Sequence, residues 1–277
     1  MSTPRNQSVI KAFAMLKAFA HPDEWLTSSE LSRRAKLPEA SGYRLIQTLE
    51  ELGAVTRGPR GKYRPGMLLV SLSQKVLIGD LLHDAAQTVV GEISRLHDLT
   101  MHVGMLEGGM VTYVAKFWTP TSFDSHTQIG AQLEAYCSGL GKVLLAALPD
   151  EQLDNFIMDG ELIALTPHTV TDPALLRLQL GEVRRQGYAL DDREIRTEMR
   201  CLAVPIHDAG GRTIAALSAS DAADRMTPER IATLRLALAA AAADIGRKMS
   251  PVDLPLRRAA LVSRTAVSPR ALAQANA

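Results

Sequence analysis

The sequence lacks the marks of an exported or membrane-spanning protein. Its 277 residues include only two cysteines, Cys137 and Cys201, which form neither a disulfide framework nor a CxxC pair. No apolar run reaches the roughly 18 to 20 residues that span a bilayer, because the longest candidate, near 231–245, is interrupted by Arg235 and Asp244. The first residues, MSTPRNQSVIK, have no apolar signal core. These absences favour a globular cytoplasmic protein with no membrane contact, and the length suggests two domains.

The sequence also lacks catalytic and metal-binding motifs. Residues 139–142 end in Gly-Lys, but Tyr136 and Val143 stand where a phosphate-binding loop needs a glycine and a Ser or Thr. Ser218 lacks the Gly-x-Ser-x-Gly elbow of hydrolases, and no spacing of Cys, His and acidic residues indicates a metal site. The sequence therefore predicts a protein that is not an enzyme, with no catalytic residues, no metal and no cofactor.

Charge is divided unequally along the chain, although the formal net charge is only +1. Residues 1–70 carry eleven Lys and Arg against six Asp and Glu, whereas residues 71–249 carry sixteen against twenty-three. A basic segment is where a nucleic-acid contact is to be sought, so the N-terminal part is the candidate DNA-binding region. Residues 250–277 combine four arginines with Pro, Ser and Ala, a composition typical of a disordered tail.

Apolar spacing predicts three short helices in the basic segment. The first has a stripe at helical intervals, formed by Val9, Phe13, Leu16 and Ala20 and widened by Ile10 and Phe19. The second, over about 28–35, opens with a capping box in which Thr27 is the N-cap and Glu30 the third residue. The third follows a tight turn and has Pro38 as its first residue and Gly53 as its stop. Its predicted buried residues are Leu45, Ile46, Leu49 and Leu52.

A basic hairpin follows, with predicted strands over 54–57 and 62–65 joined by the turn 58–61. This order is typical of a winged helix-turn-helix, whose third helix enters the major groove of DNA. We expect Arg44 to read guanine, while the plainer alternative is that Arg44 only solvates a helix face. The predicted DNA-binding residues are Glu39, Ser41, Gly42, Tyr43, Arg44, Gln47, Arg57, Arg60, Lys62 and Arg64.

The region after the hairpin mixes helices and strands. A helix over 68–83 is predicted to link the two domains. Strands are predicted over 101–106, 110–115, 200–207 and 212–220, and helices over 139–148, 173–186 and 228–248. Because these elements show no repeated βαβ units, the pattern predicts an α+β fold with helices packed on a sheet.

Several segments resemble the IclR family of bacterial transcriptional regulators. LSRRAKLP (31–38) and YRLIQTLEELG (43–53) are similar to that family's helix-turn-helix. The likeness continues in YCSGLGK (136–142), TVTDP (169–173), GYALDD (187–192), MRCLA (199–203) and AALSAS (215–220). The resemblance implies a winged helix-turn-helix over 6–67, a linker helix over 68–83 and a GAF-like α/β effector-binding domain over 84–249. Glu39 and Ala40 depart from the family, which often has a basic residue and a small hydroxyl there.

The resemblance also implies a small-molecule pocket in the C-terminal domain. Ser218 and Ser220 are two residues apart on a predicted strand, so both hydroxyls face the same side of the sheet. The effector-binding residues that the resemblance implies are Gly139, Leu140, Asp191, Cys201, Ser218 and Ser220. Free amides at a helix start suit a carboxylate, which favours an organic acid or an aromatic catabolite. The plainer alternative is that the serines satisfy buried backbone groups and Asp191 lies in a surface loop.

The sequence therefore predicts a sequence-specific DNA-binding transcription regulator whose operator binding is modulated by a small-molecule effector. Its expected partners are a double-stranded DNA operator, the effector and other copies of itself, in a homodimer or a dimer of dimers. Leu68, Leu72 and Val76 form an apolar stripe on the expected linker that supports self-association. The alternative is a metabolite-binding module or an enzyme whose helix-turn-helix serves only protein contacts.

Overall fold

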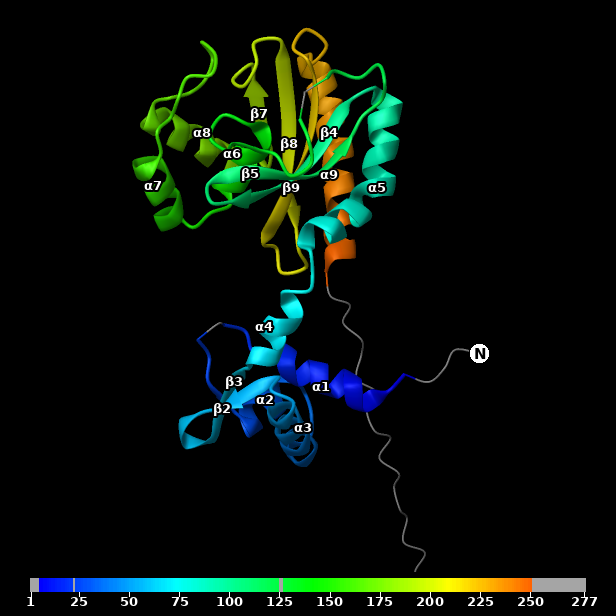
Figure 1. Ribbon diagram of the computed structural model, residues 1–277, viewed down its shortest axis with the longest axis vertical. Coiled ribbons are helices and arrows are strands. Elements are labelled where there is room, and N and C mark those ends of the chain that lie inside the picture. The colour runs from blue at the N-terminus through cyan, green and yellow to red at the C-terminus, as the bar shows by residue number, and fades with distance from the viewer. Residues whose placement is uncertain (1–4, 22, 125–126, 251–277) are drawn as a thin grey trace, which may run out of the picture. The chain divides into compact units, whose positions relative to one another are not determined.

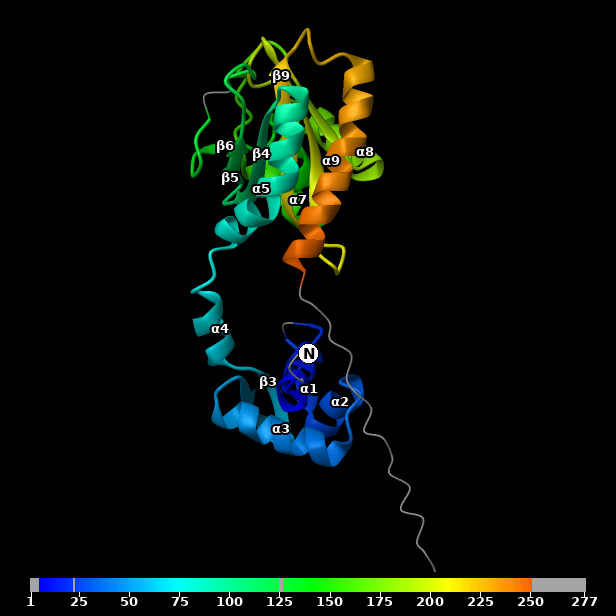
Figure 2. The same ribbon diagram turned by 90° about the vertical axis from the view of Figure 1, so that its right-hand side faces the viewer.

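The computed structural model describes residues 5–21, 23–124 and 127–250 (Figures 1 and 2). The chain divides into two compact units, and the boundary between them lies between Val76 and Leu77. Each unit has its own hydrophobic core. The tail predicted over 250–277 lies outside the described residues except for Ser250.

The N-terminal unit has the helices and the hairpin of a winged helix-turn-helix. Its helices are α1 (Gln7–Lys17), α2 (Ser28–Arg34), α3 (Glu39–Glu51) and α4 (Met67–Ser73). Its strands are β1 (Leu26–Thr27), β2 (Val55–Arg57) and β3 (Lys62–Pro65), with the short turn η1 (Pro59–Gly61) at the tip of the hairpin. The strands form an antiparallel sheet in the order β1-β3-β2.

Local sequence signals account for the ends of α2 and α3. Thr27 Oγ1 accepts a hydrogen bond from the Glu30 amide at 3.2 Å, and Glu30 Oε2 accepts one from the Thr27 amide at 2.8 Å. The predicted capping box is therefore present. Pro38 is the N-cap of α3 rather than its first helical residue. Gly53 follows the C-cap with a φ of 76°, as expected for a glycine that stops a helix.

The apolar face predicted for the first helix is partly wrong. Val9 and Phe13 are 52% and 60% exposed, whereas Met15 is fully buried. The predicted Leu16 does pack on the N-terminal core, together with Ala12 and Met15 of α1 and with Phe19 just after the end of the helix. Because α1 has apolar residues on two sides, their spacing predicts a helix but does not decide which side meets the core.

The single linker helix expected over 68–83 is also wrong, because two helices occupy this region. α4 ends at Ser73, and α5 (Ile78–His97) begins after the break at 74–77. Leu68 on α4 packs against the N-terminal core, while α5 packs against strands of the C-terminal unit. The helix is interrupted where the chain passes from one unit to the other, because each half packs on its own unit.

The C-terminal unit is built on an antiparallel sheet with helices on both faces (Figures 1 and 2). The strand order is β6-β5-β4-β9-β8-β7. The strands are β4 (Thr100–Glu107), β5 (Met110–Phe117), β6 (Gln132–Glu134), β7 (Ala189–Asp192), β8 (Met199–His207) and β9 (Thr213–Ala222). The other helices are α6 (Gly139–Ala146), α7 (Asp150–Asp159), α8 (Pro173–Gln186) and α9 (Pro228–Met249). This is the expected α+β architecture.

Two hydrophobic cores lie on the two faces of this sheet. On one face, α5 and α9 pack on β4, β8 and β9 through residues such as Val90, Leu202 and Leu238. On the other face, α6 packs on the sheet, and α8 packs on α6 through Leu176 and Leu180. The side of the sheet that carries α6 is the one that holds the cavity described below.

Candidate functional site

The exposed side of α3 carries most of the predicted groove-reading residues. Glu39, Tyr43 and Gln47 recur every four residues and are exposed, and Arg44 is exposed next to Tyr43. Ser41, at the start of the helix, is half-buried. The Tyr43 hydroxyl accepts a hydrogen bond from Gln47 Nε2 at 2.9 Å. Guanidinium, amide and carboxylate groups on an exposed helix face are the groups that recognise base edges in the major groove.

Gly42 does not belong to this exposed side, so its predicted role at the DNA is corrected. It is buried against α2, where an added Cβ would lie 1.9 Å from Ser32 Oγ and 2.9 Å from Ser32 Cβ. Ser32 is itself buried, and its hydroxyl donates to the Ser28 carbonyl at 2.7 Å. Gly42 therefore allows the two helices of the helix-turn-helix to approach closely.

The hairpin formed by β2 and β3 exposes the four predicted basic residues Arg57, Arg60, Lys62 and Arg64. The Arg64 guanidinium lies 4.9 Å from the centre of the Trp25 ring, a cation–π contact that holds this side chain in place. Arg60 lies in the turn itself, with a φ of 58°. A rigid basic hairpin suits contact with the phosphate backbone of DNA.

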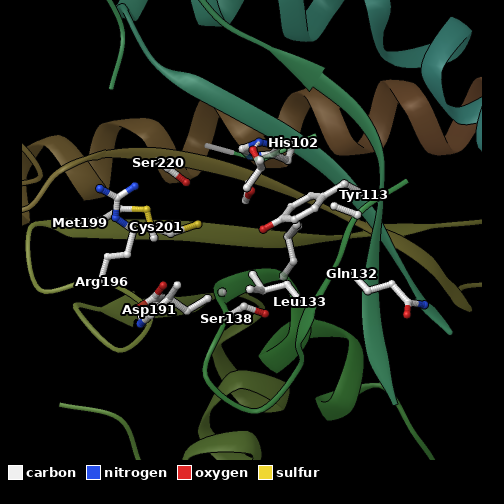
Figure 3. Close-up of a pocket in the computed structure, with 16 residues that line it drawn as sticks. His102, Tyr113, Gln132, Leu133, Ser138, Asp191, Arg196, Met199, Cys201 and Ser220 are labelled. Carbon is white, nitrogen blue, oxygen red and sulfur yellow. Dashed lines mark hydrogen bonds between the residues drawn. The ribbon is translucent and has the colours of Figure 1, made fainter. Parts of the chain in front are cut away.

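The six residues predicted for effector binding line one cavity in the C-terminal unit. The cavity has a volume of about 250 Å³ and lies between the sheet and the first turn of α6 (Figure 3). The strand residues come from β7, β8 and β9, and the other two from the start of α6. The six residues are Gly139, Leu140, Asp191, Cys201, Ser218 and Ser220.

The register of the sheet explains why these residues meet. Asp191 on β7 pairs with Cys201 on β8, and Cys201 pairs with Ser220 on β9. Residues directly opposite one another on neighbouring antiparallel strands point to the same face. Asp191, Cys201 and Ser220 therefore form a row across three strands. Ser218 lies on the same face, two residues before Ser220.

Sequence reasoning missed ten further residues of the cavity wall. These are His102, Tyr113, Thr127, Ala131, Gln132, Leu133, Ser138, Ile195, Arg196 and Met199. His102 on β4 pairs with Ser218, and its ring centre lies 4.7 Å from that of Tyr113 on β5. His102 could have been found, because it is a polar residue within the apolar strand MHVGML. The residues between β5 and β6 carry no periodic signal that points to a cavity.

Asp191 is the most unusual of the residues around the cavity. It is fully buried, and its Oδ1 accepts hydrogen bonds from the amides of Glu194 at 2.7 Å and Ile195 at 3.4 Å. Its Oδ2 is buried and has no hydrogen-bond partner within the described part of the chain. Burial raises the pKa of Asp191 to about 7, and repulsion from Glu194 adds to this rise against the stabilising hydrogen bonds.

The other titratable groups near Asp191 are either paired or neutral. Lys142 on α6 forms a buried ion pair with Glu194. Burial lowers the pKa of His102 to about 3 and raises that of Cys201 to about 12, so both are uncharged at neutral pH. Burial also raises the pKa of the Tyr113 hydroxyl. These neutral groups give the cavity a wall of hydroxyl, thiol and imidazole groups.

The start of α6 is fixed against the cavity by two local contacts. Ser138 is the N-cap, and its Oγ accepts a hydrogen bond from the Gly141 amide at 3.0 Å. Gly141 packs so tightly that an added Cβ would lie 2.1 Å from the Ala135 carbonyl oxygen. The amides of Gly139 and Leu140 belong to the first turn, where a helix leaves its donors without partners in the helix. This positive helix end suits an anionic group.

Metal clusters and membrane-spanning helices are both absent from the described residues. No cluster of three or more His, Cys, Asp or Glu side chains there could hold a metal ion. No helix among them has the length and apolar character needed to cross a bilayer.

Family comparisons match both units. Residues 8–59 match the profile described as the IclR helix-turn-helix domain. Residues 74–247 match the profile described as the bacterial transcriptional regulator IclR C-terminal domain. The second match alone spans more than half of the chain.

Individual relatives match this chain over most of its length. The HTH-type transcriptional regulator KdgR of Escherichia coli (strain K12) is 32% identical over 249 residues, which is 90% of this chain and 94% of that protein. The Pca regulon regulatory protein of Pseudomonas putida is 33% identical over 222 residues, or 79% of this chain and 76% of that protein. Among solved structures, an IclR homologue from Microbacterium hydrocarbonoxydans complexed with 4-hydroxybenzoate has a TM-score of 0.57 and 26% identity. The match covers 86% of this chain and 98% of that one.

Proposed function

The chain belongs to the IclR family of bacterial transcriptional regulators, and from that premise we propose which of its residues read DNA and which bind the effector. The chain is a DNA-binding regulator of transcription with a C-terminal effector-binding domain. We assign operator binding to residues 6–67 and effector binding to residues 84–249. The observation that carries the effector site is the row of Asp191, Cys201 and Ser220 on the wall of one cavity.

Operator binding is assigned to the exposed side of α3 and to the basic hairpin. Arg44 and Gln47 supply groups that pair with guanine and adenine, and Glu39 supplies an acceptor for cytosine. Ser41 and Tyr43 donate to phosphate, as do Arg57, Arg60, Lys62 and Arg64 on the hairpin. The exposure of these side chains and the basic character of residues 1–70 support this assignment.

The effector is assigned to the class of small organic acids and aromatic catabolites. A cavity of about 250 Å³ lies below the roughly 300 to 1,000 Å³ of pockets for drug-sized ligands, so the ligand is small. The first turn of α6 and the hydroxyls of Ser218 and Ser220 supply hydrogen-bond donors to a carboxylate. The 4-hydroxybenzoate complex of the Microbacterium homologue supports an aromatic acid as the first compound to test.

The effector assignment is tested by a thermal-shift screen of small carboxylic acids that begins with benzoate and 4-hydroxybenzoate. A ligand at about 100 times its Kd should stabilise the folded chain by roughly 2.7 kcal/mol. A compound that binds should then alter the affinity for an operator selected from random duplexes. If no acid in the screen shifts the unfolding temperature or the operator affinity, the assigned effector class is wrong.

The remaining assignments concern assembly and place of action. The exposed apolar residues Leu72 and Val76 support self-association as a homodimer or a dimer of dimers, and a two-fold dimer would read a pseudo-palindromic operator. We assign the protein to the cytoplasm because its relatives are named as regulators of transcription. We also assign it no catalytic activity, since its relatives are named as regulators of transcription.

A further inference from the structure

The charges around the effector cavity balance one another except at Asp191. Lys142 on α6 and Glu194 in the turn after β7 form an ion pair, with side chains 2% and 5% exposed. Among the described residues of the wall, Arg196 is the only cation, and its Nε donates to Glu198 Oε1 at 2.7 Å. Lys142 also attracts an ionised Asp191, but it is already paired with Glu194, and burial outweighs its attraction and raises the pKa of Asp191.

The remaining groups that face Asp191 do not change this balance. They are Cys201 on β8, Tyr113 on β5, Cys137 before α6 and His102 on β4. The first three are weak acids whose pKa is raised by burial, and the pKa of His102 is lowered by burial, so all four are neutral. Asp191 therefore has a buried, unpartnered Oδ2 and lines a cavity whose one cation among the described residues, Arg196, is paired with Glu198.

This wall offers several hydrogen-bond donors to a ligand. The hydroxyls of Ser218, Ser220 and Tyr113 can each donate, and the amides of Gly139 and Leu140 can only donate. Such a wall suits a ligand carboxylate, but an ionised Asp191 would repel that group. A protonated Asp191 removes the repulsion and turns its free oxygen into one more donor.

We propose that Asp191 takes up one proton from solvent when a carboxylate effector binds, and that its protonated Oδ2 then donates a hydrogen bond to the effector. This inference rests on the proposed effector site. The effector's carboxylate stays ionised and no covalent bond forms. Above the pKa of the unliganded Asp191, one proton enters with each anion, so effector occupancy there follows the product of the carboxylate and proton concentrations. The regulator would thereby respond to acidity and to its metabolite through one site.

The pKa of about 7 for the unliganded Asp191 places this linkage near neutral pH. At pH 6 the free carboxyl is already about nine-tenths protonated, so binding takes up only about 0.1 proton. At pH 8 it is about nine-tenths ionised, so binding takes up about 0.9 proton. The affinity for the anion should therefore be nearly constant below pH 6 and fall towards tenfold per pH unit above pH 7.

The test is calorimetry of the full chain with benzoate between pH 6 and 8.5, in pairs of buffers with different enthalpies of ionisation. The dependence of the binding enthalpy on the buffer gives the number of protons taken up, and it requires no variant.

Asp191→Asn keeps a donor at this position and removes the titration, so it should bind benzoate with the low-pH affinity of the wild type at every pH. Asp192→Asn is the matched control, because Asp192 is the next residue on β7 and its side chain is 51% exposed. The affinity for benzamide, which is neutral, should not fall tenfold per pH unit above pH 7.

The outcomes separate this inference from the effector assignment itself. Proton uptake that rises towards one with increasing pH in the wild type and the Asp192→Asn variant, but stays at zero in Asp191→Asn, would support the proton linkage. Benzoate binding that is independent of pH and buffer in the wild type would overturn the proton linkage and leave the effector site standing. An absence of benzoate binding at every pH, in the wild type and in Asp191→Asn, would overturn both. Loss of benzoate binding in a folded Asp191→Asn variant would also overturn the proton linkage, because a hydrogen-bond donor at this position would then be insufficient.

Discussion

Arg44 and the hairpin residues differ in what they can contact on a duplex. Arg44 lies on the exposed side of α3, whereas Arg60 and Lys62 lie at the tip and in the second strand of the hairpin. We expect Arg44→Ala to cost about 1 to 3 kcal/mol on the selected operator and to reduce discrimination against random duplex. Arg60→Ala and Lys62→Ala should weaken binding to both duplexes alike and lower the salt dependence. Binding titrations over a salt series measure both effects.

The hairpin variants are the matched controls for the loss of a positive charge. If Arg44→Ala kept full discrimination between operator and random duplex, Arg44 would not read a base. If Arg60→Ala changed the preferred sequence, the hairpin would read bases in addition to phosphates.

Ser218 and Ser220 offer hydroxyls to the cavity from one strand. Removal of a neutral hydrogen bond costs on the order of 1 kcal/mol, so Ser218→Ala and Ser220→Ala should each weaken effector binding about fivefold. Operator binding without effector should be retained, since these residues act only through the ligand. Calorimetry with the effector and operator titration measure the two quantities. Thr233→Ala is the control, because it removes a hydroxyl from the exposed side of α9.

Gly42 should be intolerant of a side chain. In Gly42→Ala the new Cβ would clash with Ser32 Oγ, which can move only by giving up its 2.7 Å hydrogen bond to Ser28. We expect the N-terminal unit to lose about 1 to 3 kcal/mol of stability, as is typical of overpacked sites. Trp25 fluorescence in a Trp118→Phe background would follow the urea unfolding of this unit. Gly181→Ala is the control on α8, where a Cβ would meet nothing within 4 Å, and it should not destabilise the chain.

Helix α6 is the element on which the cavity depends most. In Gly141→Ala the new Cβ would lie 2.1 Å from the Ala135 carbonyl oxygen and 2.3 Å from its Cα, which are backbone atoms that cannot rotate away. The start of α6 must therefore shift relative to Ala135, which displaces the amides of Gly139 and Leu140 at the cavity. We expect effector binding to fall at least tenfold, with operator binding by the N-terminal unit retained. Unchanged effector affinity in a folded Gly141→Ala variant would show that the position of α6 does not control the site.

The elements that the sequence predicted well are those with strong local signals. The capping box at Thr27, the proline that opens α8 and the residues Thr227 and Pro228 at the start of α9 mark helix ends through their own chemistry. The short strands β6 and β7 were not predicted, because three or four residues carry too little alternation to stand out. β7 is nevertheless the strand that carries Asp191.

The candidate site was predictable from strand alternation and family resemblance together. Spacing of two residues places Ser218 and Ser220 on one face, but no spacing relates β9 to Asp191 or His102. Those residues meet through the pairing of strands far apart in the sequence, which depends on the whole sheet. The error at Gly42 has a similar origin. Whether a residue on α3 faces DNA or packs against α2 can be decided only when the position of α2 is known.

At the level of the complete chain, self-association is the property to measure. Leu72 and Val76 are 50% and 55% exposed. Contact with a second copy of the chain would remove this apolar surface from water. Light scattering should therefore give a multiple of the 30.0 kDa chain mass. The double variant Leu72→Glu and Val76→Glu should shift the population towards monomer, while Leu236→Glu on α9 should not. A wild-type chain that stays monomeric with and without operator would contradict the dimer.

The two faces of the central sheet give the chain a means of changing its ligand in evolution. Cys201, Ser218 and Ser220 face the cavity, while Leu202, Leu217 and Ala219, the residues that alternate with them, pack in the core under α5 and α9. Folding and ligand choice therefore depend on different residues, which alternate along β8 and β9. Mutations at the first set can alter which metabolite is recognised while the second set preserves the fold. A lineage could thus acquire a new effector through variants that all keep the folded structure.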